Sequence, residues 1–226
     1  MHNIGMLLLE LEDFEGAVQH NSEALAMNMK VLGRDHIDVA IGSNNLGTCF
    51  FRQEKYAEAE EYFLDSLRMR EVIYGPGAHR DKIEVLVNIG EVKRQQNMLE
   101  EQLEIASRCK NMAEELGGAN NPEVARFLDS MCAILEHQGE YSKARRLVKR
   151  SLDIREDVFG KESLEAAYTK DILAGVYLAE KRFDEAIKLF QSSWEIRKSI
   201  LGDEHPSTLQ SQFQHQMVST MMCMNS

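Results

Sequence analysis

Apolar residues recur at intervals of three and four along most of the chain, with charged residues between them. The pattern is clearest in two segments, 36–52 and 55–73, which only Gln53 and Glu54 separate. Because an α-helix completes a turn in about 3.6 residues, this spacing places the apolar side chains on one face and predicts two amphipathic helices. Such a short link forces the helices to pack as antiparallel neighbours.

This pair of segments recurs with a fixed period. Most copies carry an aromatic residue followed three positions later by alanine; the pairs are Phe14/Ala17, Tyr56/Ala59, Tyr141/Ala144 and Phe183/Ala186. Each copy closes on a large apolar residue and a glycine, and these glycines are Gly33, Gly75, Gly117, Gly160 and Gly202. We expect each glycine to stop its helix in the left-handed conformation. The glycines are 42 or 43 residues apart, a period typical of stacked helical repeats.

We therefore predict an all-α fold, an α-solenoid of antiparallel helix pairs in a single array. The array covers 1–226, with copies at approximately 1–33, 36–75, 79–117, 121–160 and 163–202, and a partial or capping helix at 203–226. In the first copy, the first helix lacks its opening turns. The third copy is worn, because Leu99 and Gln102 replace the aromatic residue and the alanine, and Lys93 replaces an apolar residue. In the second copy, we expect Gly47 and Ala59 to let the helices cross closely.

Composition supports the helical prediction and limits the function classes. Hydrophobic residues make up 43 % of the chain, prolines number only 3, and good helix formers are abundant. The formal net charge of -11 disfavours nucleic acid as a partner, because that binding draws on Lys and Arg that neutralise phosphates. The basic run 143–150 is better explained as a solvated helix face. No apolar run reaches the ~18 residues of a membrane span, and the acidic start disfavours a signal peptide, so we expect a cytoplasmic protein.

Residues with catalytic or metal-binding chemistry are scattered along the sequence. The cysteines form no CxxC pair and are expected to be small packing residues. They are Cys49, Cys109, Cys132 and Cys223. His36, His79 and His205 recur in the loops between copies, where stacking would keep them on separate layers, so we predict hydrogen bonds at helix starts. No Ser-His-Asp set, Gly-rich phosphate loop or HExxH motif is present, and we expect no catalytic residue, no metal site and no cofactor.

The repeated residues resemble those of a known family. The pattern is Asn-Leu-Gly, then Tyr-x-x-Ala-Glu, then Ser-Leu-x-x-Arg-Glu, and finally Gly-x-x-His-Pro. It is carried by Asn45-Leu46-Gly47, Tyr56 to Glu60, Ser66-Leu67 with Arg70-Glu71, Ser151-Leu152 with Arg155-Glu156, and Gly202 with His205-Pro206. These marks look like the tetratricopeptide repeats of kinesin light chains and nephrocystin-like proteins. The resemblance implies a right-handed superhelix in which the first helix of each pair lines a concave groove.

The resemblance also implies that an asparagine just before the Leu-Gly of the first helix can hydrogen-bond the backbone of an extended peptide. That asparagine is present as Asn3, Asn45 and Asn88, whereas Ser130 and Ile172 replace it in the last two copies. An amide suits this role because it both donates and accepts hydrogen bonds. The alternative is that these asparagines bond within the solenoid.

Further residues are expected to face the groove one turn to either side. They are Asn44, Thr48, Arg52, Glu84, Glu91, Arg94, Arg126, Asp129 and His137. Their charges are mixed, so they do not indicate a clamp for acidic peptides. Arg52 and Arg94 are the best candidates for a peptide carboxylate, because a guanidinium can bind one bidentately.

These observations favour a non-catalytic adaptor that binds an extended peptide or a segment of a protein partner in the groove. The alternative is a structural spacer or a self-association module whose apolar ends stack end to end on further repeats. Kinesin light chains bind their motor through a heptad coiled coil, and the sequence contains no such heptad segment. We therefore do not expect a motor link from the resemblance.

Overall fold

The computed structural model describes the backbone of residues 2–224 and the side chains of residues 4, 5 and 7–222. Within this range the regular secondary structure is entirely α-helical, as the apolar spacing predicts. The chain divides into two compact units between Leu116 and Gly117, and each unit is described by itself.

The helices have regular lengths in both units. The first unit holds α1 (His2–Glu10), α2 (Phe14–Leu32), α3 (Ile37–Arg52), α4 (Tyr56–Tyr74), α5 (Arg80–Gln95) and α6 (Leu99–Gly117). The second holds α7 (Pro122–His137), α8 (Tyr141–Phe159), α9 (Leu164–Ala179), α10 (Phe183–Leu201) and α11 (Pro206–Met224). The first helices α3, α5, α7 and α9 have 16 residues each, and the second helices α2, α4, α6, α8 and α10 have 19. This alternation reproduces the predicted repeats.

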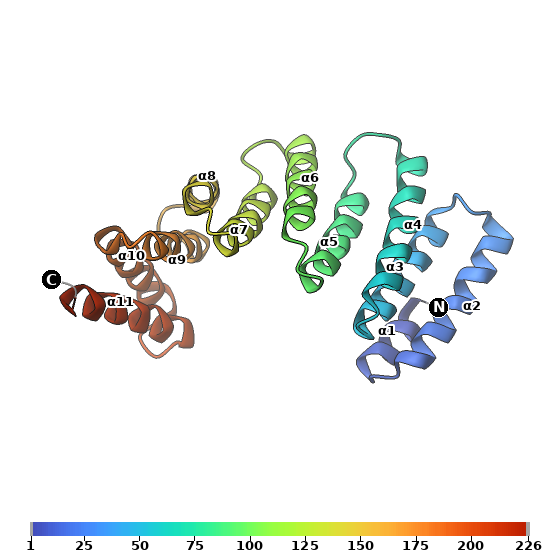
Figure 1. Cartoon of the computed structure of the whole chain (residues 1–226), viewed down its shortest axis with the longest axis horizontal. Helices are drawn as coiled ribbons and strands as arrows, with labels where there is room; N and C mark the ends of the chain where they lie inside the picture. The colour runs from blue at the N-terminus through green and yellow to red at the C-terminus, as the bar shows by residue number, and fades with distance from the viewer. Residues whose placement is uncertain (1, 225–226) are drawn as a thin grey trace. The chain divides into compact units, whose positions relative to one another are not determined.

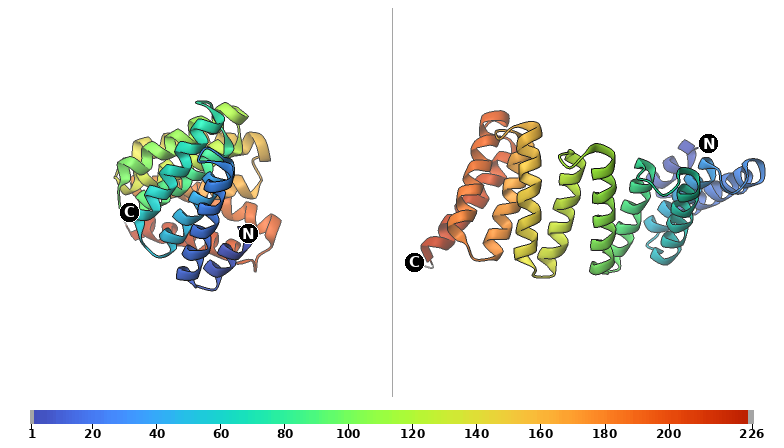
Figure 2. Two further views of the ribbon diagram at one scale, coloured as in Figure 1. Left: turned by 90° about the vertical axis from the view of Figure 1, so that its right-hand side faces the viewer. Right: turned by 90° about the horizontal axis from the view of Figure 1, so that it is seen from above.

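Consecutive helices pack side by side within each unit (Figures 1 and 2). In the first unit α3 packs on α4, and in the second α7 packs on α8 and α9 on α10. The pairs are joined because α3 also contacts α2, and α9 also contacts α8. The predicted antiparallel helix pairs are therefore confirmed.

Each turn inside a pair contains one residue with positive φ. In the first unit these residues are Glu12, Glu54 and Asn97, with φ of 60°, 60° and 58°. In the second they are Gly139 and Lys181, with φ of 76° and 59°. A residue with a Cβ atom pays roughly 1–2 kcal/mol for this conformation. Since most of these residues are not glycine, the packing of the two helices imposes the conformation on the turn.

The glycines that end the copies depart from the expected left-handed stop. Gly33 has φ 83° and ψ 168°, and Gly160 has φ 91° and ψ 154°, so φ is positive as expected but the backbone is extended at ψ. This region is open essentially to glycine alone. In the third copy the prediction at Gly117 was wrong: Gly117 is the last residue of α6, and Gly118 has the positive φ, of 82°. Two adjacent glycines are equally able to leave the helix, so the pattern could not distinguish them.

Small residues allow the close helix crossings that the sequence predicts. The alanines Ala17, Ala59, Ala144 and Ala186 are all fully buried. At Gly47, an added Cβ atom would lie 2.7 Å from the Phe63 ring, closer than real Cβ atoms approach. Glycine is therefore required where α3 crosses α4.

The worn third copy buries a charge where other copies bury an apolar residue. The side chain of Lys93 is 10 % exposed, with Nζ 2.7 Å from a Glu60 carboxylate oxygen and 2.8 Å from one of Glu101. Burial opposes the charged form, but the carboxylates of Glu101 and Glu60 outweigh it and raise the pKa of Lys93. These ion pairs link α4, α5 and α6.

The cysteines of the described side chains are packing residues, as predicted. Cys49, Cys109 and Cys132 are buried. The side chain of Cys223 lies outside the described residues.

Candidate peptide-binding surface

Polar side chains follow one side of α3 and of α5, the first helices of the second and third copies. Asn44, Thr48 and Arg52 are four residues apart on α3, and Glu84 and Asn88 have the same spacing on α5. The Thr48 hydroxyl donates to the Asn44 carbonyl at 3.1 Å. The two helices meet where Asn88 Nδ2 donates to Asn44 Oδ1 at 3.0 Å. The structure therefore brings these predicted site residues of two copies side by side.

Histidines begin the helices that carry these side chains. His36 Nδ1 accepts a hydrogen bond from the Asp38 N–H at 3.2 Å, and His79 Nδ1 accepts one from the Asp81 N–H at 3.2 Å. His205 makes the same bond at the start of α11. Each bond satisfies one of the N–H groups that the first turn of a helix leaves open. The predicted helix-start role of the three histidines is confirmed.

The three asparagines singled out by the resemblance have different surroundings. Asn88 is half-buried and bonds to Asn44, so the alternative of bonding within the array is realised there. Asn45 is half-buried and lines a pocket between α2 and α3. The side chain of Asn3 lies outside the described residues.

The two arginines proposed for a peptide carboxylate differ in their neighbours. Arg52 is exposed at the end of α3. Arg94 is also exposed, but its Nε donates to Glu91 Oε2 at 2.8 Å, and this hydrogen bond lowers the pKa of Glu91. A peptide carboxylate would have to compete with Glu91 for Arg94. Arg52 is therefore the better candidate of the two.

The remaining predicted residues lie in the second unit. Arg126 is exposed with Nη2 3.1 Å from Glu123, and His137 is exposed at the last residue of α7. Asp129 is not on the surface: its side chain is 10 % exposed, and its carboxylate lies 2.6 Å from Arg155. The placement of Asp129 facing a groove was wrong, because this side of α7 is turned toward α8.

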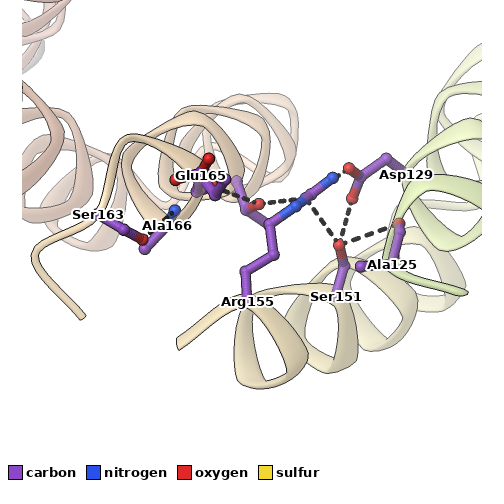
Figure 3. Close-up of polar contacts among 8 residues, drawn as sticks. Ala125, Asp129, Ser151, Arg155, Ser163, Glu165 and Ala166 are labelled. Atoms are coloured by element: carbon purple, nitrogen blue, oxygen red, sulfur yellow. Dashed lines mark hydrogen bonds and ion pairs between the residues drawn. The ribbon is translucent and has the colours of Figure 1, made fainter. Parts of the chain in front are cut away.

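A buried polar cluster joins α7, α8 and α9 at this point (Figure 3). Arg155 extends from α8 to Asp129, donates to Ser151 Oγ at 3.0 Å and donates to the Thr169 hydroxyl of α9. The Ser151 hydroxyl lies between two acceptors, Asp129 Oδ1 and the Ala125 carbonyl oxygen, the latter at 3.1 Å. Burial raises the pKa of Asp129, although Ser151 and Arg155 oppose the rise. One arginine thus bonds to both helices of its own copy and to the first helix of the next.

The cluster recurs in the fifth copy. Arg197 lies 2.6 Å from Asp171, and its Nη1 donates to Ser193 and, at 2.7 Å, to Ser211 of α11. The serine again precedes the arginine by four residues, and the next-copy hydroxyl again follows it by 14. The spacing of the three side chains is therefore a property of the repeat.

A related arrangement is found in the second copy, where Ser66 and Arg70 both donate to the Ala40 carbonyl, at 2.6 Å and 3.2 Å. In the sequence these Ser and Arg residues are recognisable only as part of the repeated family pattern, which gives them no structural role. Their role was missed because the carbonyl and the next-copy hydroxyl have no sequence signal of their own. The third copy has Arg108 and Met112 at the equivalent positions.

A pocket of about 300 Å³ lies between α2 and α3. Its lining combines apolar carbon with amides and one carboxylate, and includes Ala24, Leu25 and Asn28 from α2 and Asp38, Ile41 and Asn45 from α3. Asn45 thus connects the pocket with the polar side of α3. The apolar periodicity of α2 did not indicate this pocket, because a hollow depends on which neighbouring helix covers the residues.

A family model of the tetratricopeptide repeat matches residues 1–71, 81–157 and 124–199. The chain belongs to the tetratricopeptide repeat family. Tetratricopeptide arrays are scaffolds for protein–protein interaction, because stacked helix pairs present an extended surface to a partner. A comparison with curated proteins gave no match.

Solved structures show the same tetratricopeptide fold at low sequence identity. Nearly identical repeats of a kinesin light chain candidate from Podosopora anserina match with a TM-score of 0.75 and 14 % identity, covering 88 % of this chain and 93 % of that one. BtubC (BKLC) from P. vanneervenii matches with a TM-score of 0.72 and 13 % identity over 92 % of this chain and 83 % of that one. YrrB, a tetratricopeptide protein with an unusual peptide-binding site, matches with a TM-score of 0.56 and 16 % identity over 93 % and 89 %.

Among the residues that the structure describes, no helix is long and apolar enough to cross a membrane. The same residues contain no group of three or more His, Cys, Asp or Glu side chains that could hold a metal ion. The groups gathered on α3 and α5 are amides, a hydroxyl, guanidinium groups and carboxylates, all of which can hydrogen-bond a polypeptide.

Proposed function

We propose that this chain is a non-catalytic adaptor that binds an extended segment of a protein partner along α3 and α5. The Asn44–Asn88 hydrogen bond carries the proposal, because it aligns polar side chains from two consecutive copies on one surface. These side chains are half-buried or exposed, so a bound segment can reach them. Tetratricopeptide arrays are built for such extended contacts.

The mechanism follows from what each group can donate or accept. The amides of Asn45 and Asn88 would bond to the N–H and C=O groups of the segment, whatever side chains it carries. Arg52 would bind a carboxylate of the partner, and a carboxylate at Arg94 would displace Glu91. Backbone bonds would supply affinity, and the charged ends of α3 and α5 would supply selectivity.

The remaining expectations belong to the same proposal. The acidic net charge of -11 supports a protein partner over nucleic acid and is compatible with a cytoplasmic location. We also propose that the five copies form one array. Arg126 and His137 on α7 would be further residues that contact the partner. The proposed scaffold uses no cofactor or metal.

The first test is selection from a display library of peptides about 15 residues long, the scale of an extended segment that contacts two copies. Peptides enriched on the parent should bind an Asn45→Ala, Asn88→Ala variant about tenfold or more weakly, because two amides are lost. Asn111→Ala is the matched control, since Asn111 is exposed on α6. Circular dichroism should give equal helix content for all three proteins. If no peptide is enriched, or if the double variant binds as the parent does, α3 and α5 are not the working surface.

A second candidate function, end-to-end self-association, is favoured by apolar side chains exposed on the terminal helices. Ile4 and Leu7 are exposed on α1, Leu11 is exposed directly after it, and Leu209 and Phe213 are exposed on α11. Repeat arrays need polar terminal faces to remain monomeric in water. Light scattering should therefore give a mass that rises with concentration, and Leu209→Ser with Phe213→Ser should lower it. A single-chain mass at every concentration would contradict this function.

A further inference from the structure

Two second helices, α4 and α8, carry charges of opposite sign at equivalent positions. Both have 19 residues and begin with a tyrosine, Tyr56 and Tyr141, so their positions can be compared directly. Residues three and four positions apart form one stripe along a helix. The stripe on α4 consists of Glu58, Glu61, Asp65 and Arg68, and the stripe on α8 consists of Lys143, Arg146, Arg150 and Asp153. The sign is reversed at all four positions.

Several members of the two stripes can contact a partner. Glu58 and Glu61 on α4 and Arg146 on α8 are exposed, and within the described part of the chain none of the three forms an ion pair. Lys143 is 54 % exposed and lies 3.1 Å from Glu140. Such exposed pairs contribute little, and a lysine ammonium has three donors, so Lys143 can also bond to a second carboxylate.

An apolar side chain lies beside the stripe of α4. Leu64 is 47 % exposed there, and Lys149 is exposed at the equivalent position of α8. The methylene groups of a lysine can cover apolar surface while its ammonium remains in water. A helix with the pattern of α8 could therefore shield Leu64 as well as oppose the charges of α4.

The other second helices match α8 less well. On α6, Arg108 stands at the third position of the stripe and would oppose Arg150. On α10, Lys188 stands at the second position and would oppose Arg146. On α2, the first two positions carry no charge. Among the second helices that the structure describes, α4 therefore has the charge pattern that complements α8.

We infer that α8 of one copy of this chain binds α4 of a second copy. The two helices lie parallel, because equivalent positions are then at the same height and Arg146 meets Glu61. Leu64 packs against the methylene groups of Lys149. This contact goes beyond the extended-segment surface on α3 and α5, and it differs from end-to-end stacking because it uses the sides of two second helices.

The net charge limits the conditions under which the contact forms. Each copy has a formal net charge of -11, so two copies repel each other at a distance. In about 0.1 M salt, charges more than about 10 Å apart are largely screened, whereas the opposed side chains of the contact are much closer. Exposed ion pairs are individually weak, so the association should be measured at protein concentrations up to about 1 mM.

Reversal of the charges on either helix tests the contact. Sedimentation equilibrium of the parent in about 0.1 M salt should give a mass that rises with concentration. Lys143→Glu with Arg146→Glu makes α8 acidic like α4 and should weaken self-association about tenfold or more. Glu58→Lys with Glu61→Lys makes α4 basic like α8 and should have a similar effect.

A control variant separates the contact from the effect of net charge. Lys161→Glu with Lys188→Glu changes the net charge as much as the α8 variant does, and both lysines are exposed outside α4 and α8. Self-association of this control should stay within about threefold of the parent. Circular dichroism melts check that all variants fold.

A mixture of the α4 and α8 variants is the decisive measurement. The acidic α8 of one variant then opposes the basic α4 of the other, so unlike chains should associate about as strongly as the parent does, although neither variant associates well alone. A fluorescent label on one variant reports this association in sedimentation velocity.

Three results would overturn the inference. They are a single-chain mass for the parent up to about 1 mM, equal weakening by the control and the α8 variant, or no association of unlike chains in the mixture. The mixture also separates this contact from end-to-end stacking, because both variants keep the parent's terminal helices. It leaves the proposed function intact, because peptides selected for the α3 and α5 surface should still bind both variants.

Discussion

At the scale of single residues, the same substitution has opposite consequences at two glycines of the second unit. Gly139 has a φ of 76° in the turn between α7 and α8, whereas Gly175 lies within α9 with open space where a Cβ would stand. We expect Gly139→Ala to lower the free energy of unfolding by about 1 kcal/mol, because alanine resists the left-handed conformation. Gly175→Ala should raise it by about 0.5–1 kcal/mol, because alanine favours the helix. Urea unfolding of both variants checks the signs, and two shifts of the same sign would contradict the explanation.

His79 is predicted to stabilise α5 in two ways. Its Nδ1 accepts the Asp81 N–H, and its ring stacks on Tyr74 with centroids 3.6 Å apart. His79→Ala should lower the free energy of unfolding by about 1–2 kcal/mol, the loss typical of a helix cap. His79→Asn keeps an acceptor at this position and should fall between the parent and the alanine variant. Chemical denaturation measures both, and an asparagine variant as unstable as the alanine variant would argue against the cap.

At the scale of helices, Arg155 is predicted to be the strongest polar contact of the second unit. Arg155→Met leaves Asp129 buried without its cation and should lower the free energy of unfolding by about 3 kcal/mol. The double variant Arg155→Met, Asp129→Leu removes both charges and should recover much of this loss. Arg126→Met, which breaks an exposed pair, should cost less than about 1 kcal/mol.

The pH dependence of the single Arg155→Met variant gives an independent check. Burial raises the folded pKa of Asp129 above 3.8, and loss of Arg155 raises it further. A group with a raised folded pKa favours the folded state when protonated, so stability is regained as pH falls through the folded pKa. The deficit of the variant relative to the parent should therefore shrink as the pH is lowered from neutrality toward the ordinary titration range of an aspartate. An unchanged deficit over this range would mean that Asp129 is not the group left uncompensated.

The helices could be predicted from the sequence, but their polar partners could not. Apolar spacing alone placed α3 and α4 within one or two residues, because the spacing of buried side chains follows directly from the turn of a helix. Lys93 was correctly seen as an exception to the apolar pattern. Its carboxylate partners Glu60 and Glu101 could not be inferred, since they depend on how α4, α5 and α6 pack together.

The residues of the candidate site could be predicted from the sequence, but their contacts could not. Asn44 and Asn88 were both singled out, but not their hydrogen bond, which depends on how far α5 is displaced along α3. Asp129 was misplaced because helical spacing gives the direction of a side chain and not the presence of the neighbouring helix that buries it. The pocket beside Asn45 was missed because a hollow depends on how the side chains of α2 and α3 pack against each other.

At the scale of the whole molecule, the division between Leu116 and Gly117 falls at the end of the copy that lacks the Ser and Arg pair. Stacked repeats are stabilised by contacts between neighbouring copies, and we predict that the two units unfold separately. The sequence predicted five similar copies in one array. The position of the division was not predicted, because it depends on contacts between helices. The 42-residue spacing of the glycines carries no information about these contacts.

The buried cysteines provide a test of this division. Burial raises the pKa of Cys132 to about 12, with a further contribution from the charge of Glu136, and burial also raises the pKa of Cys49. Thiols react as thiolates, so Cys49, Cys109 and Cys132 should resist iodoacetamide near pH 8 in the folded chain. As urea increases, Cys49 and Cys109 of the first unit should become reactive together and Cys132 at a different concentration. Mass spectrometry of the modified peptides locates each reaction, and simultaneous modification of all three would show a single cooperative unit.

The contact from Arg155 to Thr169, and its counterpart from Arg197 to Ser211, also bears on how such chains can be recombined. The donor belongs to one copy and the acceptor to the next. A recombination point placed between copies would therefore separate two side chains that hydrogen-bond to each other. A crossover placed in the turn inside a helix pair, near Gly139 or Lys181, would transfer donor and acceptor together. Exchange of units that run from one inner turn to the next should therefore preserve the Arg155–Thr169 and Arg197–Ser211 contacts, whereas exchange of whole helix pairs should preserve the Asp129–Arg155 and Asp171–Arg197 ion pairs instead.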